Sequence, residues 1–199
     1  MSELPSPRDR KRQRRADAER SIATILATAV RVLNQRPDAS VEDIATAAGL
    51  TRQTVYAHYP SREALISAVI DHVTEATVAA LDAAELDEGP PAQALVRLVD
   101  AGWQTPQPYP FLAELAPMSP EESHDRHRPI LDRYERLIRR GQATGDFDRR
   151  LSPVWLVAAL IALAHTAGEE VAAGRMTHQA AGAALRESAL RLCGVKPAQ

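Results

Sequence analysis

The segment 41-VEDIATAAGLTRQTVYAHYPSREAL-65 decides the fold of this 199-residue chain. Ser40 stands directly before it and is suited to cap a helix over about residues 41–48. Acidic residues in the first turn favour the positive end of that helix. Gly49 follows the helix and can take a left-handed conformation. The first half of the segment therefore predicts a short helix that ends in a sharp turn.

The second half of the segment predicts another short helix and then a long one. Thr51 is placed to cap a helix over about residues 52–59, and Pro60 disfavours helical geometry at the residue before it. Ser61 offers a cap for the long helix that follows. Apolar residues recur at helical intervals along the rest of the chain, without strand-like alternation or an internal repeat. We therefore expect an all-α protein with an N-terminal three-helix helix-turn-helix domain.

The helix over residues 52–59 has an outward face suited to a DNA major groove, which admits one helix. Val55 and Tyr59, four residues apart, are expected to face the protein. Arginine bonds guanine through two donors, glutamine bonds adenine, and the threonine methyl contacts thymine, whereas tyrosine and histidine suit phosphate oxygens. The residues left to face outward are Arg52, Gln53, Thr54, Tyr56 and His58.

The segment resembles the signature of the TetR family of transcriptional regulators. The resemblance rests on Gly49, on the Tyr56-x-His58-Tyr59 cluster and on the run Ser61-Arg-Glu-Ala-Leu65. It implies a DNA-binding regulator, by family habit a repressor, whose fourth helix moves when a ligand enters the larger domain. It also implies that Arg52, Gln53 and Thr54 contact bases and that Tyr56, His58 and Arg62 hold the DNA backbone. With the two helix caps, the predicted DNA-binding residues are Ser40, Thr51, Arg52, Gln53, Thr54, Tyr56, His58 and Arg62.

Charge divides the chain into a basic head and an acidic body. Residues 1–62 carry a net charge of +4 and residues 63–199 a net charge of −6. We expect 1–62 to be the DNA-binding domain with a basic N-terminal arm, because a basic surface suits a polyanion; a solvated arm without a partner is the alternative. No apolar stretch follows the arginines of the arm, and Cys193 is the single cysteine, so a secretory signal is not predicted and the cytoplasm is the expected compartment.

Residues 63–199 are expected to form a helical effector-binding and dimerisation domain, with helices at about 128–141, 153–174 and 177–193. The last two predict a hairpin too apolar for an isolated pair, so we expect a homodimer with a four-helix interface; burial within one subunit is the alternative. The expected interface residues are Ala158, Ile161, Ala162, Ala181, Ala184, Leu185, Ser188 and Leu192. Two recognition helices about 34 Å apart would contact a palindromic operator on double-stranded DNA. The uncharged stretch 151–168 is too short for a membrane span, and we predict no membrane association.

Aromatic residues of the body predict a cavity for a small apolar or aromatic effector. Plain core packing is the alternative for each residue taken singly. The predicted pocket residues are Trp103, Phe111, Leu112, Met118, Tyr134, Trp155 and His165.

Two histidines offer the only alternative chemistry. His124 and His127, three apart among carboxylates, would suit Zn²⁺ or Ni²⁺ in a metal-responsive regulator or serve as an enzyme site. Arg126 and Arg128 argue against a metal there, so we predict no metal, no cofactor and no catalytic residue. The chain has no phosphate-binding glycine loop and no nucleophile elbow. A non-specific architectural DNA-binding protein is a further alternative, although it would not need the large body.

Overall fold

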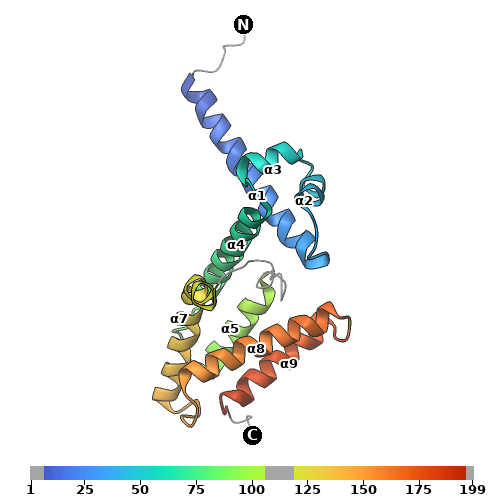
Figure 1. Cartoon of the computed structure of the whole chain (residues 1–199). Helices are drawn as coiled ribbons and strands as arrows, with labels where there is room; N and C mark the ends of the chain where they lie inside the picture. Colours follow the sequence, from blue (N-terminus) through green and yellow to red (C-terminus); the bar gives the residue numbers. More distant parts are fainter. Residues whose placement is uncertain (1–6, 106–118, 196–199) are drawn as a thin grey trace. The chain divides into compact units, whose positions relative to one another are not determined.

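The computed structural model describes residues 7–105 and 119–195, which form eight helices and no strand (Figure 1). The predicted all-α class is therefore confirmed. The chain divides into two compact units, Met1–Val69 and Ile70–Gln199. The helices are α1 (Pro7–Gln35), α2 (Val41–Ala47), α3 (Arg52–His58), α4 (Arg62–Ala83), α5 (Pro91–Gln104), α7 (Pro120–Thr144), α8 (Pro153–Ala172) and α9 (His178–Leu192).

The N-terminal unit holds α1 to α3 and the first turns of α4. Its core is made of aliphatic side chains that recur every three or four residues on α1, α2 and α4, the spacing that puts them on one face. Helix α3 adds one fully buried residue, Val55. The other fully buried large residues of the unit are Ile25, Leu33, Ile44, Leu65 and Ile66.

Helix α1 begins much earlier than its apolar pattern indicates. The pattern starts at Ile22, whereas α1 starts at Pro7 and its first buried residue is Ile25. The basic arm is therefore the first half of a single 29-residue helix. Arginine, lysine, glutamine, glutamate and alanine, which make up most of the arm, all have high helix propensity.

The C-terminal unit packs α5, α7, α8 and α9 around one core. Helices α8 and α9 form the predicted hairpin, joined by a turn in which Gly174 has a φ of +69°. Helix α5 packs against α7 and α9, and α7 packs against α8. The largest fully buried side chains of this core are Leu81, Leu95, Leu98, Leu137, Ile138 and Leu156.

Helix α7 begins earlier than predicted. The sequence predicts a start near residue 128, but α7 starts at Pro120 and continues through Pro129. Ser119 and Glu122 form a capping box that starts the helix upstream. Proline removes one backbone donor from the helix, and the carbonyl left without it belongs to Asp125, an exposed residue that water can reach.

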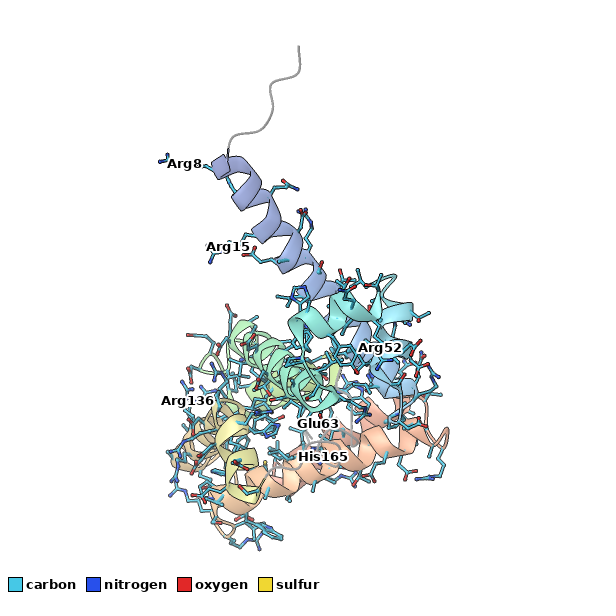
Figure 2. The ribbon with its side chains drawn as sticks, turned by 45° about the horizontal axis from the view of Figure 1, so that its top comes forward. Arg8, Arg15, Arg52, Glu63, Arg136 and His165 are labelled. Carbon is cyan, nitrogen blue, oxygen red and sulfur yellow. The ribbon has the colours of Figure 1, made fainter. Side chains whose placement is uncertain are left out.

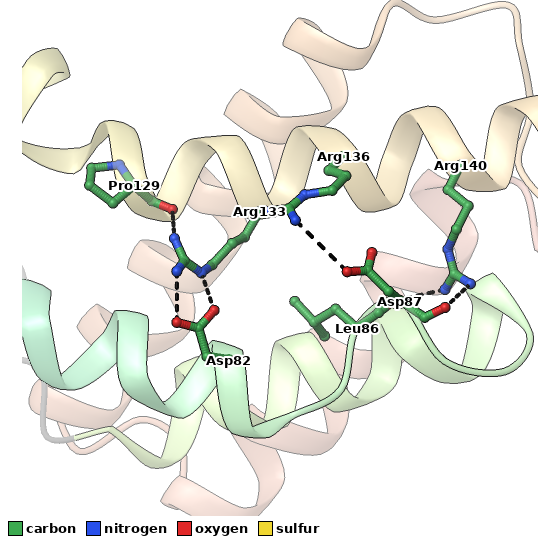
Figure 3. Close-up of polar contacts among 7 residues, drawn as sticks. All are labelled: Asp82, Leu86, Asp87, Pro129, Arg133, Arg136 and Arg140. Carbon is green, nitrogen blue, oxygen red and sulfur yellow. Dashed lines mark hydrogen bonds and ion pairs between the residues drawn. The ribbon is translucent and has the colours of Figure 1, made fainter.

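Arginines of α7 hold the turn between α4 and α5 (Figure 3). Arg133 donates two hydrogen bonds of 2.7 Å to the carboxylate of Asp82 near the end of α4. Arg140 donates to the backbone carbonyls of Leu86, Asp87 and Gly89 at 2.8 to 3.0 Å. A turn leaves carbonyl groups without helical partners, and the guanidinium groups satisfy several of them here. The end of α4 is thus fixed to α7 within the C-terminal unit.

Candidate nucleic-acid interface

Ser40 and Asp43 start α2 through a reciprocal pair of hydrogen bonds. The Asp43 backbone N–H donates to Ser40 Oγ at 3.1 Å, and the Ser40 backbone N–H donates to Asp43 Oδ2 at 2.8 Å. The Ser40 hydroxyl also donates to Asp43 Oδ2 at 2.7 Å, and this bond, the bond from the Ser40 N–H and Arg36 at 3.4 Å hold the pKa of the Asp43 carboxyl below its ordinary value. The predicted cap at Ser40 is confirmed, and its side chain forms hydrogen bonds with Asp43 at the start of α2.

The turn between α2 and α3 follows the predicted geometry. Gly49 has a φ of +68°, and the Leu50 N–H donates to the Ala45 carbonyl at 2.9 Å. Thr51 then caps α3, because its Oγ1 accepts from the Thr54 N–H at 3.1 Å. A tight turn capped at both ends fixes the direction in which α3 leaves the unit.

The first turn of α3 presents two exposed side chains, Arg52 and Gln53. The Arg52 guanidinium lies 5.2 Å from the centre of the Tyr56 ring and 3.7 Å from Glu42 on α2. Thr54 is half-buried, and its hydroxyl lies 2.8 Å from that of Thr51. The two long side chains are therefore available to base edges, whereas the Thr54 hydroxyl already has a partner within the helix.

The second turn of α3 carries half-buried rings and lies near an arginine tie. Tyr56, His58 and Tyr59 are all half-buried, and burial raises the pKa of Tyr59. Arg62 donates to the backbone carbonyls of Pro37 at 2.9 Å and of Ala39 at 3.4 Å. Arg62 thus ties α4 to the α1–α2 turn within the unit, a structural role that the sequence did not indicate.

Comparison with known proteins matches the part of the chain that forms this interface. The family model "Bacterial regulatory proteins, tetR family" matches residues 25–69, which run from the first buried residue of α1 into α4. The HTH-type transcriptional repressor LfrR of Mycolicibacterium smegmatis is 41% identical over 83 residues. Residues 25–69 therefore match the tetR family of bacterial regulatory proteins. The predicted family resemblance is therefore confirmed, with the helix-turn-helix at its centre.

Each match in sequence covers less than half of the length of the related regulator. The match spans 44% of the length of LfrR, and a 42% identical match to the HTH-type transcriptional regulator EthR of Mycobacterium tuberculosis spans 34% of that protein. Similarity in structure extends further. The crystal structure of LfrR from Mycobacterium smegmatis in complex with proflavine has a TM-score of 0.72 at 29% identity, over 90% of this chain and 98% of that one. The PfmR regulator from Thermus thermophilus has a TM-score of 0.68 at 23% identity, over 87% of this chain and 99% of that one, which supports the fold alone.

Four of the seven predicted pocket residues lie in the described part of the chain. Phe111, Leu112 and Met118 lie outside the described residues. Trp155 is 59% exposed near the start of α8 because that first turn directs Leu156 and Val157, and not Trp155, into the core. Trp103, Tyr134 and His165 are half-buried in the C-terminal unit. Trp155 is therefore a surface residue of the protomer, and the other three remain candidates.

Trp103 and His165 differ in their surroundings. The Trp103 ring stacks on His178 with a centroid distance of 4.7 Å, and its Nε1 donates to the His178 carbonyl at 3.2 Å. Gly182 gives this ring room, because a Cβ there would lie 2.6 Å from Trp103 Nε1. Burial lowers the pKa of His165; Glu169 opposes the shift and His127 adds to it. A neutral imidazole in a half-buried position suits a polar contact to a small molecule.

The predicted dimer residues divide between two faces of the hairpin. Ala158, Ala162 and Ala184 are exposed. Ile161, Ser188 and Leu192 are half-buried. Ala181 and Leu185 are 0% and 5% exposed, because α9 turns them into the core of their own protomer, and both leave the expected interface.

Sequence reasoning also missed two exposed apolar residues beside Trp155. Leu151 is 41% exposed and Val154 is 66% exposed. The absence of charged residues from 151 to 168 is the signal in the sequence that could have indicated an exposed apolar face. Only three of the twenty residues of α8 are buried.

The histidine segment of α7 lies at its first turns. His124 is exposed, His127 is half-buried, and Arg126 between them lies 3.4 Å from Asp71. No three His, Cys, Asp or Glu side chains gather into a metal site among the described residues. Two helices, α4 and α8, are long and apolar enough to cross a membrane by composition alone, a test that core helices of soluble proteins also pass.

Proposed function

We propose that this chain is a transcriptional repressor that binds a palindromic operator as a homodimer and leaves it when a small aromatic molecule binds the C-terminal unit. The observation that carries the proposal is α3 itself, a helix capped by Thr51 with Arg52 and Gln53 exposed on its first turn. The match of residues 25–69 to the TetR family model and the likeness to the repressor LfrR support the same function, and a cytoplasmic location goes with it.

Base recognition falls to the two exposed side chains of α3. An arginine or glutamine that bonds a base edge through two hydrogen bonds gives about 1–3 kcal/mol of discrimination against the wrong base. The contact of Arg52 with Tyr56 and its weak pair with Glu42 hold the guanidinium over the first turn of α3. Such pre-positioning lowers the entropy lost when the arginine binds a base.

The uncovered face of α8 supports the dimer. Trp155, Ala158 and Ala162 recur at three- and four-residue intervals on this helix and are exposed in the protomer, as is Leu151 just before the helix. Small residues let two helices approach closely, and an exposed tryptophan anchors many interfaces. A second copy seated on this face gives a two-fold assembly, and a two-fold protein matches a palindromic site.

An aromatic effector is supported by the half-buried Trp103, Tyr134 and His165 and by the likeness to LfrR, whose crystal structure contains proflavine. Proflavine, a planar aromatic dye, is therefore the first probe. We expect it to raise the melting temperature of the protein and to weaken its binding to DNA. Raised stability without release from DNA would contradict the effector part of the proposal.

The test of DNA recognition compares two glutamines of the N-terminal unit. Gln53→Ala removes an exposed side chain of α3, and Gln35→Ala removes an exposed side chain at the end of α1. Against operator variants that differ at single base pairs, we expect Gln53→Ala to lose about 1–3 kcal/mol of discrimination at one position per half-site. Gln35→Ala should behave as the wild type. Equal discrimination by all three proteins would contradict the assignment of α3.

A further inference from the structure

The positive charge of the N-terminal unit lies in one short segment. Residues 8–15 contain six Arg and Lys residues and one Asp, for a net charge of +5. Residues 16–62, which hold the whole helix-turn-helix, contain five Arg and Lys residues and five Asp and Glu residues. The part that the TetR family model matches starts only at residue 25. The folded helix-turn-helix is therefore electrically neutral, and the attraction of this unit for a polyanion rests on the arm, residues 8–15.

The arm is helical but has no core of its own. Figures 1 and 2 both show the N-terminal half of α1 running clear of α2 and α3. Arg8, Arg12 and Arg15 are exposed, and Figure 2 shows Arg8 and Arg15 extending away from the helix on the same side. In the described part of the chain, the ion pair of these three side chains joins Arg15 to Glu19 at 3.8 Å, with both side chains more than 70% exposed. Such a pair contributes little.

The three arginines form a stripe along one face of α1. They are spaced four and three residues apart, and residues at this spacing lie on one side of a helix. Five full helical turns take 18 residues, so the stripe lies on the same face as the residues 18 positions later. Those residues are Leu26, Val30 and Leu33, all buried in the N-terminal unit. The basic stripe therefore continues the side of α1 on which the helix-turn-helix packs.

Without a partner of opposite charge, the helical conformation of the arm is energetically unfavourable. Like charges four residues apart repel, and cations near a helix N-terminus oppose its dipole. Arg8, Arg12 and Arg15 are exposed, and the first buried residue among the described side chains of α1 is Ile25, so core packing does not offset these effects along the stripe. A row of phosphates on the stripe would remove both penalties, because each strand of duplex DNA carries a phosphate every ~3.4 Å of axis and the arm helix is about 12 Å long.

We propose that the stripe formed by Arg8, Arg12 and Arg15 binds the phosphate backbone of duplex DNA beside each operator half-site and supplies most of the salt-dependent affinity. The inference rests on the proposed DNA-binding function and adds to it a division of labour. Helix α3, within the electrically neutral helix-turn-helix, selects the DNA sequence, and the arm provides the attraction that is independent of sequence. The arm helix becomes protected from unfolding only when DNA is bound.

The test uses the full-length protein and two triple variants of equal charge. Arg8→Gln, Arg12→Gln and Arg15→Gln together remove the stripe. Exposed arginines of the C-terminal unit provide the matched control, in which the substitutions are Arg128→Gln, Arg139→Gln and Arg191→Gln. Operator affinity is measured by fluorescence anisotropy between about 50 and 300 mM salt, a range over which phosphate contacts change affinity strongly. Hydrogen exchange of residues 8–20 is measured with and without DNA.

Each phosphate contact contributes about 0.9 to the slope of log affinity against log salt. We expect the arm variant to lose about 2.7 from this slope per protomer and at least about tenfold in affinity at physiological salt, with the same footprint. The control should match the wild type, and DNA should slow exchange in the wild-type arm. An arm variant with the wild-type slope would overturn the inference and leave the proposed function intact. An arm that binds phosphatidylglycerol vesicles but not DNA would also overturn it, and failure of the wild type to bind any operator would overturn the proposed function.

Discussion

Replacing Gly141 with alanine would bring a methyl carbon into a steric clash with the ring of Phe147. A Cβ at Gly141 would lie 2.1 Å from Phe147 Cδ2 and 2.4 Å from Cε2. The ring has no room to swing away, because Phe147 is 2% exposed and its backbone N–H donates to the Gly141 carbonyl at 3.0 Å. The connection between α7 and α8 thus depends on a residue without a side chain at position 141.

The magnitude follows from two opposing effects. Carbon atoms in contact prefer a separation of about 3.5–4.0 Å, so the helix and ring must separate by more than ~1 Å. Overpacking of this kind costs about 1–3 kcal/mol, whereas alanine gains about 1 kcal/mol over glycine as a helix former. We expect a net loss of up to about 2 kcal/mol, which lowers the melting temperature by about 4–8 °C in a chain of this length.

The assay is thermal unfolding followed by circular dichroism, with Gly102→Ala as the matched control. A Cβ at Gly102 would lie 3.4 Å from the Tyr134 hydroxyl, so this variant should melt at or slightly above the wild type. In a Phe147→Ala background the clash is gone, and Gly141→Ala should then raise the melting temperature. A Gly141→Ala variant as stable as the wild type, or one equally destabilised in both backgrounds, would refute the packing argument.

Three further outcomes are expected. Burial lowers the pKa of His165 below its ordinary value of 6.5, so the unfolded chain binds more protons than the folded chain near that pH, and stability falls as the pH falls. His165→Asn should therefore flatten the drop in melting temperature between about pH 7 and 5. An unchanged pH profile would contradict this. Arg62→Ala removes the donors to Pro37 and Ala39 and should cost about 1.5–3 kcal/mol of stability while weakening binding to every DNA sequence, so unaltered unfolding would place its role elsewhere. Trp155→Ser should shift sedimentation at micromolar concentration toward the monomer without loss of helix content; an unchanged dimer would rule out the face with Trp155.

The helix-turn-helix could be predicted because its signals are local. Ser40, Thr51 and Ser61 each cap a helix through a hydrogen bond to a residue three positions on, and Gly49 takes the positive φ that the turn requires. Each of these features depends on residues that are neighbours in the sequence. The order and type of the helices around them followed directly.

The body could be predicted only in outline, because its details depend on contacts between distant residues. Leu185 and Ala184 are adjacent in an alanine-rich helix, and only the packing of α5 and α9 shows that Leu185 is buried and Ala184 exposed. Trp155 is an aromatic residue of the kind that lines pockets, but it lies on the surface of the protomer. The family resemblance predicts that Arg62 contacts DNA. The sequence around it does not indicate its hydrogen bonds to carbonyls more than twenty residues away.

The decisive measurement is footprinting of the full-length protein on fragments that it selects from the chromosome encoding it. We predict protection of an inverted repeat whose half-site centres lie about 10 base pairs, or a multiple of one helical turn, apart. Protection should disappear when Arg52 and Gln53 are both replaced by alanine, although the variant remains folded because both side chains are exposed. Absence of any protected inverted repeat with the wild-type protein would contradict the account.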